Sequence, residues 1–220
     1  IKKAIQVNTI PLIAIMTAVT TVLTMFVKIP TPTRGYLNLS DTMIFFSSYA
    51  FGPWVGGIIG GLGPALSDLI SGYPQWAIFT FIIDGLQAVL VGLLVREFKP
   101  ANVVIGSLVA GVWKVFGYFI AGGILSGFGP ALGEIIGNSF QMVVGLIVGF
   151  ALFSCGCCKG FIRRWCDSAT SASRPASDTL LSCINKARGF TDERRFHGLY
   201  LYIFVHIVSV VAVFAAGAMG

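Results

Sequence analysis

Five ionisable side chains interrupt apolar stretches of this 220-residue sequence. An isolated charge in a hydrocarbon layer costs several kcal/mol, so such groups pair with one another, contact a ligand or line a cavity. They are therefore the first candidates for function, as parts of a binding site, an ion pair or a proton pathway. The five residues are Asp41, Asp68, Asp84, Lys114 and Glu134.

Asp84 and Lys114 lie deepest within their apolar stretches. At 1.5 Å per residue, both are about 12 to 18 Å from the outer ends of their segments. We expect them to pair with each other or with a bound ligand, and an ion pair that merely ties two helices together is the structural alternative. Asp41, Asp68 and Glu134 fall at segment ends, so we expect them near the outer surface, where carboxylates also cap helices or meet solvent.

Aromatic and amide side chains accompany these charges, and together they suit the binding of a flat polar ring. Asn138 and Gln141 are three residues apart, so both can point into one cavity from one helix face. An aromatic belt at the membrane surface is the alternative for Tyr36, but it does not suit Trp113 in the middle of its segment. The predicted substrate-binding residues are Tyr36, Asn38, Asp84, Gln87, Trp113, Lys114, Tyr118, Asn138 and Gln141.

Common catalytic motifs are missing from the sequence. It contains no GxxxxGK[ST] phosphate loop, no HExxH zinc motif and no GxSxG nucleophile motif. Its five cysteines fall between residues 155 and 183, and no second ligand pair follows them at a metal-binding spacing. No catalytic residue, metal site or cofactor is therefore predicted. If ATP drives the process, another subunit must hydrolyse it.

The composition places these residues on membrane helices. With a mean hydropathy of +0.85, 55% hydrophobic and 11% charged residues, the chain lacks the polar surface of a soluble domain. We expect an all-α polytopic membrane protein: a six-helix membrane domain over residues 1–153, a cytoplasmic Cys-, Ser- and Arg-rich linker over 154–198, and an additional seventh transmembrane helix over 199–220. The apolar stretches are 10–29, 39–51, 54–70, 76–95, 102–126, 131–153 and 199–219.

Basic residues set the expected orientation, because Lys and Arg near helix ends stay on the cytoplasmic side. With a cytoplasmic N-terminus, twelve of the fifteen basic residues face the cytoplasm, whereas Lys28 and Arg34 face out. This asymmetry accounts for the net charge of +6, so we expect a multi-pass protein of the cell membrane with no nucleic-acid partner. Small residues four apart predict close helix contacts. These pairs are Ala14/Ala18, Gly56/Gly60 and Gly57/Gly61.

Longer strings of the sequence resemble one protein family. The strings are GYLNLSDTMIFFSSYAFGPWVGG from Gly35, GLGPALSDLISGY from Gly61, IIDGL from Ile82, VFGYFIAGGIL at residues 115–125 and EIIGNSFQMVVGLIVG at residues 134–149. They are similar to the S component, the membrane-embedded substrate-binding subunit, of energy-coupling factor (ECF) vitamin transporters. The resemblance covers about residues 5–153.

The resemblance implies a six-helix subunit that binds a water-soluble vitamin or precursor from outside, beneath the first outer loop. It implies as partners a transmembrane scaffold subunit and two ATPase subunits, with Ala14 and Ala18 on the docking face. Relatives of this subgroup are associated with riboflavin, pyridoxine or the hydroxymethylpyrimidine precursor of thiamine. The sequence departs from the family at Asp84 and Gln87, where the motif is often IIKGLE, and at Lys114, where the fifth span is usually apolar.

Three classes of function follow, and the leading one is a vitamin-binding S component without chemistry of its own. The second is a self-sufficient secondary transporter that relays protons through Asp84 and Lys114. The third is a membrane enzyme that uses Asp41, Asp68 and Glu134. The enzyme is disfavoured because no nucleophile or metal cluster accompanies these carboxylates.

Overall fold

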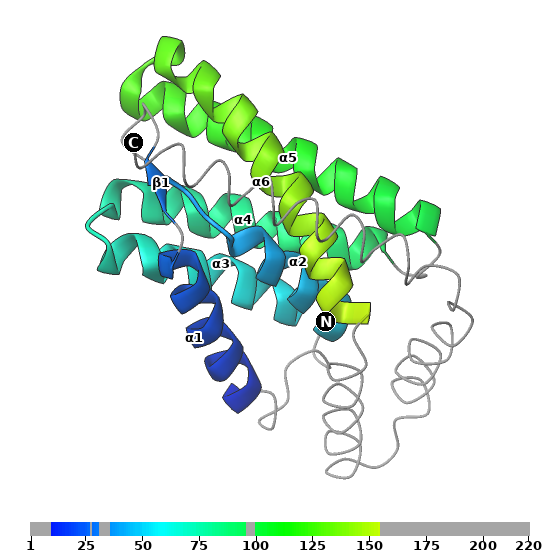
Figure 1. The fold of residues 1–220 in the computed structure, drawn as a ribbon. Helices are drawn as coiled ribbons and strands as arrows, with labels where there is room; N and C mark the ends of the chain where they lie inside the picture. The colour runs from blue at the N-terminus through cyan, green and yellow to red at the C-terminus, as the bar shows by residue number, and fades with distance from the viewer. Residues whose placement is uncertain (1–9, 27, 31–35, 96–99, 155–220) are drawn as a thin grey trace, which may run out of the picture.

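The computed structural model describes residues 10–26, 28–30, 36–95 and 100–154. These residues form six helices and one short antiparallel strand pair (Figure 1). The expected linker and seventh helix lie outside the described residues, so they stay predictions. The elements are α1 (Ile10–Phe26), β1 (Ile29–Pro30), β2 (Tyr36–Leu37), α2 (Ser40–Phe51), α3 (Pro53–Ile70), α4 (Pro74–Leu94), α5 (Pro100–Ser126) and α6 (Phe128–Ser154).

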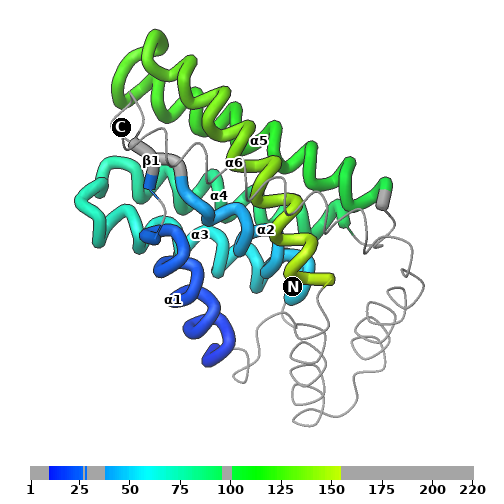
Figure 2. Tube along the Cα trace, in the orientation of Figure 1, coloured from blue at the N-terminus to red at the C-terminus, as the bar shows by residue number. Residues whose placement is uncertain are grey.

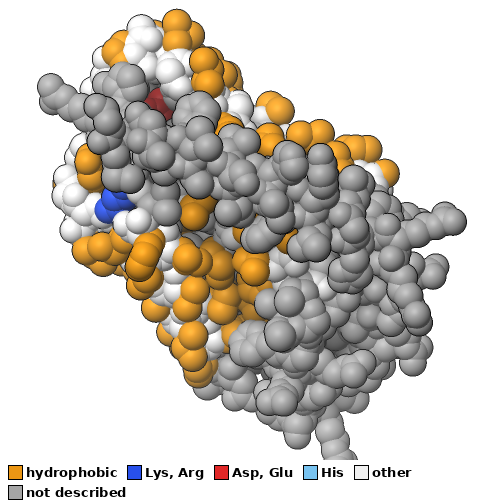
Figure 3. Space-filling model, viewed as in Figure 1, with side chains coloured by type: hydrophobic (Ala, Val, Ile, Leu, Met, Phe, Trp, Pro, Cys, Tyr) orange, Lys and Arg blue, Asp and Glu red, His pale blue; other side chains and the backbone are white. Residues whose placement is uncertain are grey.

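The six helices confirm the six apolar stretches expected before residue 154. Three of them are long and apolar enough to cross a membrane: α4, residues 101–126 of α5, and α6. Side chains such as Ile78, Val112 and Ile136 are 70%, 68% and 77% exposed. Hydrophobic side chains also spread over the described surface in Figure 3. Lipid, rather than water, suits such an exterior.

Proline and glycine set the helix boundaries. Pro53 and Pro74 occupy the first turns of α3 and α4, where the missing N–H costs no hydrogen bond. Between α2 and α3, Gly52 has φ +84°, and between α5 and α6, Gly127 has φ +90°. Side chains other than glycine rarely adopt this left-handed backbone, so both glycines permit abrupt connections between neighbouring helices.

The helices pack in neighbouring pairs, and their arrangement is visible in Figures 1 and 2. α3 lies along α4, and α5 lies along α6. α1 packs on α3, whereas α2 lies among α3, α4 and α6. Much of the apolar core gathers around Tyr49 of α2, which contacts the rings of Phe45, Phe150 and Phe153. Its hydroxyl lies 2.7 Å from the hydroxyl of Ser107 in α5.

The glycine pairs of α3 make the close contacts that their spacing predicted. A Cβ on Gly61 would lie 2.9 Å from the carbonyl oxygen of Phe81, and one on Gly60 would lie 2.9 Å from the Cβ of Ala88. One on Gly56 would lie 2.8 Å from the Cα of Ser48. The absence of side chains therefore lets the α3 backbone approach α4 and α2 directly.

Candidate functional site

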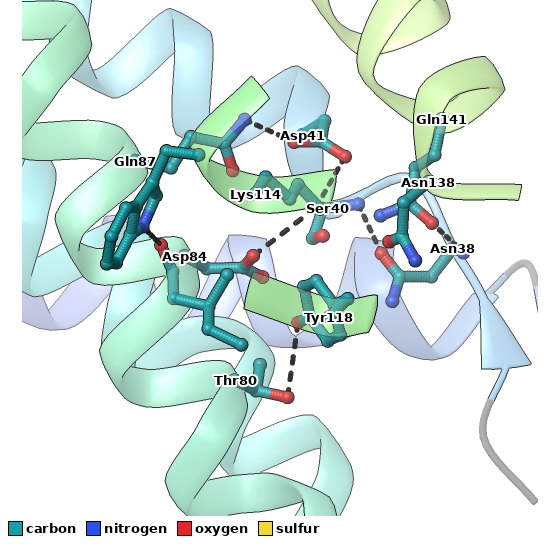
Figure 4. Close-up of polar contacts among 12 residues, drawn as sticks. Asn38, Ser40, Asp41, Thr80, Asp84, Gln87, Lys114, Tyr118, Asn138 and Gln141 are labelled. Atoms are coloured by element: carbon teal, nitrogen blue, oxygen red, sulfur yellow. Dashed lines mark hydrogen bonds and ion pairs between the residues drawn. The ribbon is translucent and has the colours of Figure 1, made fainter. Parts of the chain in front are cut away.

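Asp41 lies inside the bundle rather than near its outer surface. Its side chain is fully buried, with Oδ2 2.6 Å from the Lys114 Nζ and Oδ1 accepting a hydrogen bond of 2.8 Å from the Gln87 Nε2 (Figure 4). The expectation that Asp41 caps a helix at the membrane surface is therefore wrong. α2 has only 12 residues and begins beside Lys114, well inside the 27-residue helix α5. An apolar stretch that starts within a bundle does not mark the membrane edge.

The expected pairing of Asp84 with Lys114 is confirmed, at 3.3 Å between Oδ1 and Nζ. Lys114 thus lies between two carboxylates from two helices, and it is itself fully buried. We refer to Asp41, Asp84, Gln87 and Lys114 as the lysine cluster. Apart from its ion pair with Lys114, Asp84 Oδ1 makes no hydrogen bond within the described residues, and Gln87 Oε1 has no hydrogen-bond donor there. The cluster therefore has more acceptors than its single ammonium group satisfies.

A small polar cavity adjoins this cluster, and its volume is about 30 Å³. Asp68 and Glu134 line it, and each is only 5% exposed. Glu134 does not lie in the first turn of α6, so the helix-capping expectation is wrong for it, and burial contradicts a solvent-facing place for both carboxylates. The lining residues are Asn38, Asp68, Trp76, Thr80, Tyr118, Glu134, Asn138 and Gln141.

Hydrogen bonds hold one wall of the polar cavity in place. The Tyr118 hydroxyl donates to Thr80 Oγ1 at 3.3 Å, and Thr80 donates to Asp68 Oδ2 at 2.6 Å. The Trp76 and Tyr118 rings lie beside each other, with centroids 6.1 Å apart. The Trp76 Nε1 is buried without an acceptor among the described residues. This N–H is therefore an unused donor in a residue that lines the cavity.

The opposite wall joins α6 to the segment before α2. Asn138 Nδ2 donates to Glu134 Oε2 at 2.9 Å, four residues earlier on α6. Gln141 Oε1 accepts from the backbone N–H of Asn38 at 2.9 Å, and Asn38 Oδ1 accepts from the N–H of Ser40 at 2.7 Å. Asn38 therefore fixes both the cavity wall and the start of α2.

Four of the predicted site residues meet at this cavity: Asn38, Tyr118, Asn138 and Gln141. Lys114 lies 5.4 Å from the centre of the Tyr118 ring, so the lysine cluster directly adjoins the cavity wall. Trp113 does not line the cavity, because its Nε1 donates to the backbone carbonyl of Ile83 at 3.1 Å. The Tyr36 backbone pairs with Pro30, and its side chain lies outside the described residues.

Four lining residues were absent from the predicted set: Asp68, Trp76, Thr80 and Glu134. The spacing of polar residues along the helices could have indicated three of these four residues. Trp76 and Thr80 precede Asp84 by eight and four residues, and Glu134 precedes Asn138 by four, so each continues a polar stripe on its helix. Asp68 lies at the end of α3, where no such stripe exists.

The geometry suits binding rather than bond-breaking chemistry. Two aromatic faces, several amides and two carboxylates surround the cavity, as in sites for small polar ligands. Among the described residues, no group of three His, Cys, Asp or Glu side chains is placed to hold a metal ion.

Comparison with known proteins identifies a matching family model and several relatives of this chain. The model of the ECF-type riboflavin transporter S component family matches residues 4–155. The thiamine precursor transporter HmpT of Lactococcus lactis subsp. cremoris is 34% identical over 149 residues, which cover 67% of this chain and 86% of HmpT. An uncharacterized protein in a gap 3′ region of Pyrococcus woesei is 42% identical over 134 residues, covering 60% of this chain and 90% of that protein. A UPF0397 protein of Lacticaseibacillus casei is 37% identical over 101 residues, or 44% and 53% of the two chains.

Proposed function

Because the chain belongs to the ECF-type riboflavin transporter S component family, we propose that it captures a small water-soluble vitamin or vitamin precursor in its polar cavity. The family consists of transporter subunits rather than enzymes. The observation that carries the proposal is the meeting of Trp76, Tyr118 and three amide side chains around one polar cavity. The candidate ligands are riboflavin, pyridoxine and the hydroxymethylpyrimidine precursor of thiamine, and the relative HmpT is a thiamine precursor transporter.

The proposal extends to the partners and the placement of the chain. An ECF scaffold subunit and two ATPase subunits would complete the importer, because the chain has no phosphate loop of its own. Residues 1–153 would form the S-component domain of a multi-pass cell-membrane protein with a cytoplasmic N-terminus. Residues 154–198 would be a cytoplasmic linker, and 199–220 an additional transmembrane helix.

The direct test is mass spectrometry of small molecules that stay with the full chain through purification. We expect a single vitamin-class compound, which the purified chain then rebinds in a calorimetric titration. The matched variant combines Asn138→Ala with Gln141→Ala, which removes two amides from the cavity wall, and it should retain less of the compound. Transport by proteoliposomes that contain this chain alone would contradict the proposal and favour the secondary transporter with its relay through Asp84 and Lys114.

Trp76→Phe separates ligand binding from folding. The indole N–H of Trp76 is buried without a partner among the described residues, so its removal costs no hydrogen bond, and only the lost packing of the larger ring should lower the free energy of unfolding. If the ligand accepts a hydrogen bond from this N–H, its affinity should fall by about fivefold to tenfold. Titration and thermal unfolding of the same preparation measure both effects. An unchanged affinity would show that the ligand does not use this donor.

Ala14→Trp and Ala18→Trp test the docking face. Both alanines are exposed on α1, so a bulky ring there should not disturb the bundle. It should keep a partner helix at a distance, and recovery of the scaffold and ATPases with the tagged chain should fall about tenfold or more. Ile136→Trp, at a position on α6 that is also exposed, is the control and should co-purify normally. If only Ile136→Trp lost the scaffold and ATPase subunits, the docking face would lie on α6 rather than on α1.

A further inference from the structure

The lysine cluster contains two carboxyl groups and one ammonium group. Asp41, Asp84 and Lys114 are each at most 1% exposed, and Lys114 is the one buried cation among the residues that the structure describes. A buried carboxylate without a counter-ion is strongly unfavourable, and such a group takes up a proton instead. Because one ammonium group balances one carboxylate, the other carboxyl group of the cluster favours its neutral form.

The contacts show which of the two carboxyl groups carries the negative charge (Figure 4). Asp41 accepts two hydrogen bonds, at 2.6 Å from Lys114 Nζ and at 2.8 Å from Gln87 Nε2. Asp84 Oδ1 lies 3.3 Å from the same Nζ and makes no hydrogen bond in the described part of the chain. Hydrogen bonds to an ionised acceptor are the shorter and stronger ones. The negative charge therefore belongs on Asp41, and Asp84 is the group that suits a proton.

Gln87 gives a second and independent reason to place a proton on Asp84. Its side chain is fully buried, and because its Nε2 donates to Asp41, its Oε1 is left without a donor among the described residues. Asp84 precedes Gln87 by three residues on α4, so the two side chains share one helix face. A carboxylate only accepts hydrogen bonds, whereas a neutral carboxylic acid has one O–H to donate. A proton on Asp84 thus supplies the donor that Gln87 Oε1 lacks.

The ionisable groups that act on Asp84 come from three neighbouring helices. They are Asp41 on α2, Asp68 on α3, and Lys114 and Tyr118 on α5. Lys114 favours a charged Asp84, but it makes its shorter contact with Asp41, whose negative charge disfavours a second one nearby. Asp68 belongs to the wall of the polar cavity, and this balance holds whether or not it is charged.

We infer that the lysine cluster is a proton-binding site, in which Asp84 holds one proton and donates it as a hydrogen bond to Gln87 Oε1. The cluster then has one negative charge, on Asp41, and one positive charge, on Lys114. None of its four members lines the polar cavity, so the proton stays with the protein when a ligand enters. A retained proton is the opposite of a relay through Asp84 and Lys114, and it does not depend on which compound the cavity binds.

Infrared spectroscopy of the purified full chain in lipid nanodiscs tests for this proton. A neutral carboxylic acid has a carbonyl stretching band that a carboxylate lacks, and we expect the parent chain to show one such band that Asp84→Asn removes. Asp68→Asn is the matched control outside the cluster and should leave that band in place. Asp41→Asn should also remove it, because Asp84 then becomes the single counter-ion of Lys114 and ionises. A parent spectrum from which Asp84→Asn removes no band would overturn the inference, as would a band that persists in Asp41→Asn.

Folding of Asp84→Asn provides a second measurement. Asparagine has the shape of the neutral acid and keeps both a donor and an acceptor, so the variant should unfold at the same denaturant concentration as the parent. Near neutral pH, an exposed aspartate is ionised, so the parent should release about one proton more on unfolding than Asp84→Asn does. Calorimetry in buffers of different ionisation enthalpy counts these protons. A destabilised or unfolded Asp84→Asn would overturn the inference, because it would show that the fold needs a charge at this position.

Proton movement across the membrane separates a retained proton from a relay. Proteoliposomes that contain the full chain alone and enclose a pH-sensitive dye should lose an imposed pH difference no faster than protein-free liposomes. A faster loss that Asp84→Asn abolishes would overturn the inference, because the proton would then exchange with both sides of the membrane.

Discussion

Lys114→Met should lower the free energy of unfolding by about 3 to 5 kcal/mol, because it leaves two buried carboxylates without their counter-ion. Asp41 would lose a contact of 2.6 Å and Asp84 one of 3.3 Å, and all three side chains are at most 1% exposed. Methionine has a similar length and no charge, so lost packing contributes little. Denaturant unfolding in detergent, followed by tryptophan fluorescence, measures the change.

Further substitutions in the Lys114→Met background show which carboxylate depends most on the Lys114 ammonium group. If Asp84 were the sole partner of Lys114, adding Asp84→Asn to Lys114→Met would restore stability. The shorter contact to Asp41 predicts that this double variant stays destabilised, because Asp41 remains charged. Adding Asp41→Asn as well should recover most of the loss, since Gln87 can still donate to the new amide oxygen. Full recovery in the double variant would contradict the geometry of the lysine cluster.

Gly145→Ala is expected to be the most damaging methyl group that can be added to α6. A Cβ at Gly145 would lie 2.9 Å from the backbone carbon of Asp41 and 3.0 Å from the backbone nitrogen of Thr42. Backbone cannot rotate away, so α2 and α6 must separate, which typically costs about 1 to 3 kcal/mol. The shift would also move Asp41 away from Lys114. Thermal unfolding should therefore show a clearly lower midpoint.

Gly129→Ala is the matched control in the same helix. Apart from its own neighbours in the chain, no atom lies within 4 Å of a Cβ built there, so the methyl group contacts no other helix. Pro130 follows directly and disfavours a helical alanine at position 129, so this variant carries a small local cost of its own. Gly129→Ala should nevertheless lose much less stability than Gly145→Ala, because it forces no helices apart. Similar losses in both variants would mean that the effect comes from the helix itself rather than from its contact with α2.

Hydropathy predicted the helices well because a membrane span must be long, apolar and internally hydrogen-bonded. The same signal misplaced Asp41. It records where an apolar stretch starts, and in a short helix such as α2 that point lies within the bundle beside Lys114. The depth of a residue in the bundle therefore depends on how neighbouring helices pack against its segment. The composition of that segment alone carries no information on this packing.

The cavity was predictable where residues share a helix face, as Asn138 and Gln141 do. Helix packing decides which faces of different helices meet. This packing depends partly on glycines far away in the sequence, such as Gly145, where α6 approaches α2. Trp113 illustrates the limit: its type and depth suit a ligand site, but a rotation around α5 directs its N–H to the Ile83 carbonyl instead. Residue type alone does not determine the direction of a side chain.

The pairing of Asp41 with Lys114 also bears on how the protein is made. Asp41 precedes its counter-ion by 73 residues, so α2 leaves the ribosome long before α5. With 12 residues it is shorter than the roughly 20 needed for a stable span, and an unpaired aspartate adds about 3 kcal/mol to the cost of insertion. We therefore expect the segment to reach its final depth only after α5 has entered the bilayer. Insertion of this fold would then depart from sequence order, because an early segment needs a later one.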